Sequence, residues 1–405
     1  MSKKRSPVQE ALLRQRRASG SGVDPFPLTG APSLSSHTSR YNPASAYPLR
    51  RPASASPTSL CVPQARFPNA SLSPAARNFI CPSTTTYNTK LRRRKALLIG
   101  ICYRNHRYLT PVPGARNDVI AMYDLLTGPF FGFSKSNIHI LCDEQLISRG
   151  LQARQPTRRE IIQEMGWLTE GITNGDSVVF FFAGHGEMVQ DTSGDEIETG
   201  FDQCIMPVDF MPKRAFDDKG RLPSFRGVDP ILDDIIYNQL VRAVPEGAKI
   251  TAIVDACKSG TICDLPVLYD DNGTPRYRNG ASQPPRDLRH DYKSAGGCVL
   301  FSGSADHQLS ADMLVTVRGT NGERPTHQSF GIMTRSFVDA VHEMCKSRGR
   351  KYNGVENWSY GDLLRRVKEL VKERCGVFVP SYLERQEPQL SSSHAFDLFQ
   401  TNFSM

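Results

Sequence analysis

The chain has 405 residues, 39% of them hydrophobic and 22% charged, which is ordinary for a soluble globular protein with one large α/β domain or two smaller ones. The formal net charge of +9 could indicate a nucleic-acid partner, but much of the excess lies in the N-terminal tail, so we expect no nucleic-acid binding. No apolar run approaches the roughly 18 residues of a membrane span, and no secretory signal begins the chain, so we expect no membrane binding. The ten cysteines form no CxxC pair, and we expect a protein of the cytoplasm and also of the nucleus.

Residues 1–90 are rich in Ser, Pro, Ala and Arg and show little hydrophobic periodicity. Proline interrupts helices and strands, and a segment with few apolar residues cannot bury enough surface to fold. We therefore expect a disordered N-terminal extension with a regulatory or partner-binding role.

The rest of the chain alternates apolar runs with segments of helical periodicity. Strands are expected at 96–101, 137–141, 176–182, 249–254 and 297–302, with a short last segment around residue 390. Helices are expected at 117–126, after an N-cap at Thr157 as far as 168, at 229–244, at about 331–347 and at about 359–373. Because the strands are apolar on both faces, the pattern predicts an α/β fold with a mostly parallel sheet and helices on both faces.

Three of these strands are followed by polar segments, Ala183–Glu187, Asp255–Cys257 and Gly303–Asp306. Parallel sheets bind ligands at the carboxyl ends of their strands, so all three segments should lie on one rim of the sheet.

Cys257 and His185 are the reactive candidates on this rim. A thiolate is a strong nucleophile, and a histidine can take and return its proton near neutral pH. Taken alone, Cys257 could be a small buried hydrophobe and His185 a turn residue between two glycines. Their joint position at strand ends favours a Cys–His dyad. His307 is a second histidine on the rim. The cysteines in apolar segments are assigned to the core: Cys102, Cys142, Cys204, Cys298 and Cys345.

Four motifs stand out in the chain from about residue 95 onward: Gly184-His185-Gly186, Asp255-Ala256-Cys257-x-Ser259-Gly260, Asp202-Gln203-x-Ile205-x-Pro207-Val208-Asp209 and Gln389-Leu390-Ser391-Ser392-Ser393-His394. In these motifs the chain resembles the type I metacaspases, which are caspase-like cysteine peptidases of fungi, plants and protists, and a fungal source is expected. The resemblance implies a caspase-like peptidase domain at 91–405. Its parts would be a large-subunit-like part at about 91–268, a basic loop at 269–295 and a small-subunit-like part at 296–405.

The resemblance also implies roles for single residues. Cys257 would attack the scissile carbonyl, His185 would protonate the leaving amine, and the backbone amides of Gly186 and Cys257 would form the oxyanion hole. Cleavage would follow Arg or Lys, because Asp118 and Asp255 correspond to the acids that receive the substrate cation. Without the resemblance, Asp118 would be taken as an acid near a helix N-terminus. The substrates would be proteins or peptides, and the enzyme a monomer.

Calcium dependence is a further implication, because Ca²⁺ prefers several carboxylate and carbonyl oxygens. The family's ligands correspond to four aspartates: Asp202, Asp233, Asp234 and Asp264. Their ordinary interpretation is a solvated helix face for Asp233 and Asp234 and a turn for Asp264. The polar segment 269–293 carries Arg276, Arg278, Arg286, Arg289 and Lys293, and these cations suit self-processing by the expected specificity, although a merely flexible loop would look the same.

Five positions depart from the family pattern. Lys258 stands where His is common, Glu187 where Gly is usual, Ala115 and Ala183 where Cys and Ser are frequent, and His307 in place of an acid. None removes an essential group, but together they affect efficiency and specificity. The alternative function is therefore a weakly active or inactive relative that acts as a scaffold in protein quality control.

Overall fold

The computed structural model describes residues 92–146, 150–191, 200–212, 227–277, 294–317, 326–348, 358–379 and 386–405. The predicted N-terminal extension and most of the basic loop lie outside these ranges, and the division of the peptidase domain into parts stays a prediction. Within the described ranges, no helix combines the length and the apolar character needed to cross a membrane.

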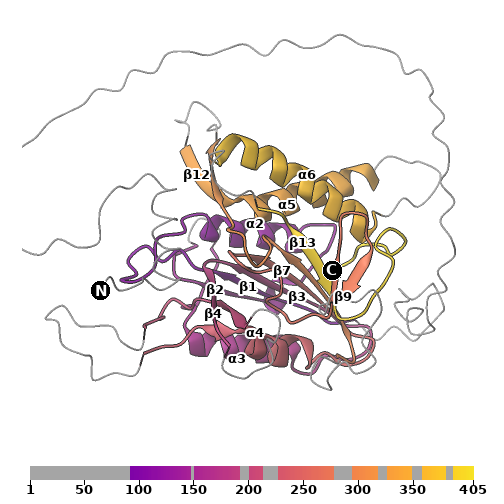
Figure 1. Cartoon of the computed structure of the whole chain (residues 1–405), viewed down its shortest axis with the longest axis horizontal. Coiled ribbons are helices and arrows are strands. Elements are labelled where there is room, and N and C mark those ends of the chain that lie inside the picture. The colour runs from indigo at the N-terminus through magenta and orange to yellow at the C-terminus, as the bar shows by residue number, and fades with distance from the viewer. Residues whose placement is uncertain are drawn as a thin grey trace, which may run out of the picture.

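A central sheet of eight strands runs in the order β2-β1-β3-β7-β10-β13-β8-β9 (Figure 1). The parallel strands are β1 (Arg94–Gly100), β2 (Ile138–Cys142), β3 (Ser177–Ala183), β7 (Lys249–Asp255) and β10 (Gly297–Ser302). Three antiparallel strands extend one edge: β13 (Gln389–Ser392), β8 (Val267–Tyr269) and β9 (Pro275–Tyr277). The predicted, mostly parallel sheet is confirmed.

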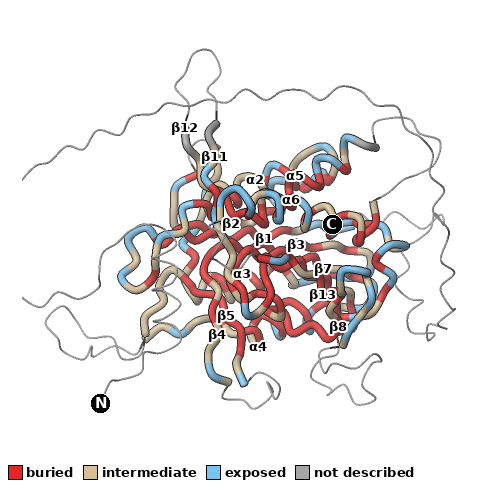
Figure 2. Tube along the Cα trace, turned by 45° about the horizontal axis from the view of Figure 1, so that its top comes forward, coloured by how far each residue is buried: buried red, intermediate tan, exposed pale blue. Residues whose placement is uncertain are grey.

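Helices cover both faces of the sheet because alternate side chains of each strand point to opposite faces. One face packs against α2 (Ala115–Thr127), α5 (Ile332–Arg348) and α6 (Tyr360–Phe378). The other packs against α3 (Arg158–Thr169), the short α4 (Asp233–Ile236) and a π-helical turn, η4 (Tyr237–Val241). Figure 1 shows these two layers, and Figure 2 shows buried residues concentrated along the strands between them. The predicted N-cap is confirmed, since Thr157 accepts a hydrogen bond from the backbone of Glu160.

The predicted helix at 229–244 is wrong at both ends. A short strand, β6 (Ile231–Leu232), precedes α4 and pairs with β5 (Phe201–Ile205), which also pairs with β4 (Gly186–Gln190). This three-stranded sheet and the hairpin of β11 (Asp312–Val317) and β12 (Thr326–Gly331) were not predicted. The backbone N–H of Gln203 donates to the carboxylate of Asp233 at 2.7 Å, which fixes the start of α4 against the neighbouring strand.

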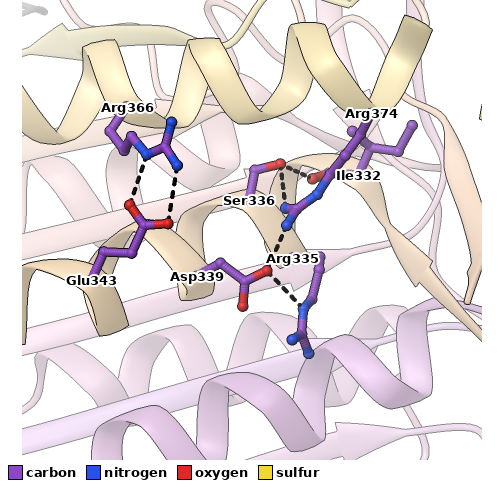
Figure 3. Close-up of polar contacts among 7 residues, drawn as sticks. All are labelled: Ile332, Arg335, Ser336, Asp339, Glu343, Arg366 and Arg374. Carbon is purple, nitrogen blue, oxygen red and sulfur yellow. Dashed lines mark hydrogen bonds and ion pairs between the residues drawn. The ribbon is translucent and has the colours of Figure 1, made fainter. Parts of the chain in front are cut away.

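Helices α5 and α6 are joined by a polar network (Figure 3). The guanidinium of Arg374 donates to the hydroxyl of Ser336 at 2.8 Å and contacts the carboxylate of Asp339 at 2.5 Å, with its side chain 18% exposed. Arg366 makes a two-pronged contact with Glu343 at 2.7 and 3.0 Å, but these side chains are 33% and 44% exposed. Burial therefore distinguishes two otherwise similar interhelical ion pairs.

We expect Arg374→Met to lower the free energy of unfolding by about 1–3 kcal/mol, because it leaves a partly buried carboxylate with one cation fewer. Arg366→Met is the matched control and should cost about 0–1 kcal/mol, as exposed ion pairs do. Urea unfolding of both variants measures the difference. Equal losses would show that burial does not set the strength of these pairs.

Candidate active site

Strands β3 and β7 place His185 and Cys257 side by side on one rim. The two strands are parallel and in register, with Ala183 opposite Asp255, and the backbone N–H of Gly184 donates to the carbonyl of Asp255 at 3.3 Å. His185 and Cys257 each follow this matched pair by two residues. The sheet thus brings together the two residues that the sequence predicted as a dyad.

Gly186 lies directly against the backbone of Cys257. A Cβ atom added at Gly186 would stand 2.2 Å from the carbonyl oxygen of Cys257, so no larger residue fits without moving the chain. The two predicted oxyanion-hole residues are therefore packed against each other.

The imidazole of His185 is oriented by two neighbours. Its Nε2 lies 2.7 Å from the carbonyl oxygen of Thr110, and the ring of Tyr103 packs on it with 4.8 Å between centroids. The Tyr103 hydroxyl accepts from the backbone N–H of His185 at 3.2 Å and donates to the carbonyl of Met206 at 2.5 Å. Because a carbonyl can only accept, Nε2 carries the proton and Nδ1 is left as the basic nitrogen. Burial lowers the pKa of His185 to about 4.

The thiol of Cys257 is buried and, at rest, protonated. Burial raises the pKa of Cys257 to about 11, against the backbone N–H of Ser310, which donates to the sulfur at 3.2 Å. Glu187 raises this pKa further and Lys258 lowers it. With the pKa of His185 lowered as well, both reactive groups are uncharged near neutral pH, so a proton has to move before the sulfur can attack.

Asp118 and Asp255 converge on the start of α5. The backbone N–H of Gly331 donates to both carboxylate oxygens of Asp118, at 3.1 and 3.0 Å. Thr334 donates to Asp255 through its backbone and its hydroxyl, each at 2.8 Å. Burial raises the pKa of both acids, and the charge of Asp255 raises that of Asp118 further. The predicted pair of acids therefore lies together, on the rim that carries Cys257.

Asp312, at the start of β11, is a third acid that the sequence analysis missed. Its carboxylate accepts from the backbone N–H of Gly114 at 3.2 Å and from the hydroxyl of Ser329 at 3.4 Å. Although the residue as a whole is exposed, desolvation of its carboxylate and then the charge of Asp255 raise its pKa to about 6. The signal available in the sequence was Ser310-Ala311-Asp312, which places an acid shortly after the last rim segment, Gly303–Asp306.

The remaining rim residues have different settings. Asp306 accepts from the backbone N–H of Thr261 at 2.9 Å and from its hydroxyl at 3.1 Å, so it fixes the segment after Cys257. His307 is exposed, whereas Ala115 and Ala183 are buried.

Three of the four predicted calcium ligands are buried and close enough to repel one another. Burial, and then the charges of Asp264 and Asp202, raise the pKa of Asp233 to about 9. Asp264 has a positive φ of 47°, a conformation that favours glycine. Asp234 is less buried and donates its backbone N–H to Asp233 at 3.0 Å. Crowded carboxylates suit a cation. In the described part of the chain, however, no three such side chains lie in positions to bind a metal ion together, so these residues would have to move to bind calcium.

Comparison with known proteins identifies the class of enzyme. The family model for the metacaspase, peptidase C14 domain matches residues 94–266. Metacaspase-1 of Debaryomyces hansenii is 30% identical over 352 residues, covering 78% of this chain and 68% of that protein. Metacaspase-1 of Arabidopsis thaliana is 30% identical over 331 residues, covering 77% and 79% respectively. The solved structure of pro-sf-caspase-1 is 10% identical with a TM-score of 0.38, covering 78% of this chain and 95% of that one, which is too distant to support an argument.

Fold, site and relatives together define a cysteine peptidase. The chain belongs to the metacaspase family, as the sequence motifs predicted.

The neutral resting site predicts how Cys257 reacts with iodoacetamide. Since burial holds its pKa at about 11, the alkylation rate should rise steadily between pH 7 and 10. A resting thiolate–imidazolium pair would instead give a rate that is flat above about pH 5. Peptide-resolved mass spectrometry measures the rate at Cys257, and the same chain in denaturant, where the thiol should titrate at about pH 8.5, is the control.

Proposed function

We propose that this protein is a calcium-dependent endopeptidase that cleaves after Arg or Lys through Cys257 and His185. The observation that carries the proposal is the juxtaposition of buried acids and a buried thiol on one rim: Asp255 ends the same strand that Cys257 follows. A nucleophile beside converging carboxylates favours attack on a peptide whose side chain is a cation.

In this mechanism the substrate carbonyl lies between Cys257 and the backbone N–H groups of Gly186 and Cys257. Nδ1 of His185 takes the thiol proton as the sulfur attacks, and the two N–H groups stabilise the developing oxyanion. His185 then gives the proton to the departing amine, which leaves a thioester on Cys257. A water molecule, deprotonated by His185, attacks the thioester, the bond from carbon to the Cys257 sulfur breaks, and the sulfur takes the proton back from His185 as the acid product leaves.

Specificity for Arg or Lys follows from the cost of holding three carboxylates close together. Burial raises the pKa of Asp118, and the charges of Asp255 and Asp312 raise it further, while the charge of Asp255 also raises the pKa of Asp312. A guanidinium or ammonium group among them removes this repulsion and gains charge-assisted hydrogen bonds. An Asp side chain would instead add to the repulsion.

The test is cleavage of short reporter peptides that end in Arg, Lys or Asp before the scissile bond, with and without calcium. We expect cleavage after Arg and Lys only, abolished by Cys257→Ala. Preference for Asp would contradict the specificity. A parent protein inactive at every calcium concentration would instead favour the scaffold function.

Asp312→Asn should lower kcat/KM for Arg reporters by about tenfold, because it removes one charge from the cation-binding cluster. In the parent protein, kcat/KM should also fall as pH drops through about 6, where Asp312 becomes protonated and loses its charge. The variant should lack that step. Glu343→Gln, which removes an exposed carboxylate of α5, is the matched control and should leave the profile unchanged.

Calcium would bind through the carboxylate oxygens of Asp202, Asp233, Asp234 and Asp264. The cation would supply positive charge to three crowded, buried acids. Asp264 follows Cys257 by seven residues, so binding would also order the segment that carries the nucleophile. The basic loop at 269–295 would then be the first substrate of the activated enzyme.

We expect calcium to generate new N-termini within 269–295 in the parent protein, detected by terminal sequencing and absent in Cys257→Ala. Asp264→Asn should raise the calcium concentration required by about tenfold or more, because one charged ligand is lost. Calorimetric titration of Cys257→Ala, with and without Asp264→Asn, measures binding without cleavage. Unchanged affinity in the Asn variant would remove Asp264 from the site.

We further propose that the enzyme acts as a monomer on protein or peptide substrates in the cytoplasm, with the nucleus as a second location. The absence of CxxC pairs among its ten cysteines supports a reducing compartment.

A further inference from the structure

Two departures from the metacaspase pattern meet in space beside the reactive residues. Glu187 takes the place of the usual glycine after Gly186, and Lys258 takes the place of the common histidine after Cys257. The ammonium group of Lys258 and the carboxylate of Glu187 form an ion pair. Both side chains are largely removed from solvent, with 17% and 11% exposed.

We propose that Glu187 and Lys258 are positioning residues that clamp the His185 turn to the Cys257 turn and offset each other's charge at the thiol. The inference rests on the proposed function of Cys257 as nucleophile, and it adds two residues that the sequence pattern assigned no role.

The ion pair joins the residues that directly follow the two predicted oxyanion donors. Glu187 directly follows Gly186 and Lys258 directly follows Cys257, so the ion pair links the residues next to each donor. The donors are also in backbone contact, at the glycine that tolerates no Cβ. The distance between the His185 turn and the Cys257 turn is therefore set by the Glu187–Lys258 ion pair as well as by the sheet.

The backbones of both partners are held in place by other segments of the chain. Lys258 has a positive φ of 54°, a conformation uncommon for residues with a side chain, and its backbone N–H donates to the carbonyl of Gln308 at 3.0 Å. Glu187 pairs with Cys204 across β4 and β5, and the Cys204 thiol donates to its carbonyl oxygen at 3.2 Å. The two backbones are anchored by different neighbours, and the ion pair connects them through side chains.

The pair also sets the charge balance at Cys257. The charged groups that act on this thiol are Glu187 on β4, Lys258 beside it and Asp255 on β7. Glu187 and Lys258 also act on the Cys204 thiol of β5, His185 leaves the neighbouring strand at the same level as Cys257, and Asp306 binds the segment after Cys257 at Thr261. Glu187 raises the pKa of the thiol and Lys258 lowers it. Loss of one partner therefore leaves the other uncompensated, and the two losses act in opposite directions.

The test uses Glu187→Gln, Lys258→Met and the double variant in the full chain. Iodoacetamide alkylation of Cys257 is followed against pH, and kcat is measured on an Arg reporter with calcium. Glu187→Gln should move the alkylation profile to lower pH by about 0.5–1, Lys258→Met should move it to higher pH by a similar amount, and the double variant should lie near the parent.

For the clamp itself, each single variant should lower kcat by about three- to tenfold, and the double variant should lose less than the product of the two. Lys258→Arg keeps the charge and should restore most of kcat relative to Lys258→Met. Glu343→Gln, in an exposed pair on α5, is the control that should move neither readout.

Shifts of both single variants in the same direction, or losses in kcat that simply multiply, would overturn the proposal. If the parent cleaves no peptide, the proposed function fails, while the alkylation profiles still decide whether the two charges oppose each other at the thiol. A peptidase whose single variants match the parent would retain its proposed function and lose the clamp. Should the neutral variants not fold, a Lys258→Arg profile displaced from that of the parent would overturn the charge balance, and an unchanged one would support it.

Discussion

The in-register pairing of β3 with β7 is the constraint on which the rest of the site depends. It sets Ala183 opposite Asp255, so the next turns of both strands leave the sheet at the same level. Residues 178–183 and 250–255 are all buried, and a slip of one residue would turn each side chain to the opposite face of the sheet. A large hydrophobic penalty therefore protects the relative position of His185 and Cys257.

The helical layer on one face of the sheet supplies one of the acids and holds another. Helix α2 carries Asp118, and the first turn of α5 donates backbone and hydroxyl hydrogen bonds to Asp255 through Thr334. The positive end of the α5 dipole partly compensates a charge that burial makes costly. These acids are thus held close together despite their repulsion, and the substrate cation that we propose would complete the arrangement.

Burial shifts both reactive groups toward their neutral forms, the thiol of Cys257 and the imidazole of His185. Buried acids elsewhere, such as Asp233, show the same tendency. In the resting protein, the thiol of Cys257 and the imidazole of His185 are therefore both uncharged on a poorly solvated rim. Substrate and calcium, as proposed here, would each bring a charge that this environment lacks.

The sequence alone predicted the parallel sheet and the family and singled out His185 and Cys257 as the candidate dyad, because continuous apolar strands and a His and a Cys at strand ends are local patterns. It failed at 229–244, where the contacts of β6 with β5 override helical periodicity, and it did not find the short strands β4 and β5. Only the tertiary structure placed Asp312 with Asp118 and Asp255, and joined Glu187 to Lys258. Each of those groupings joins segments far apart in the chain, and strand register and side-chain packing, which no local pattern encodes, decide whether such residues meet.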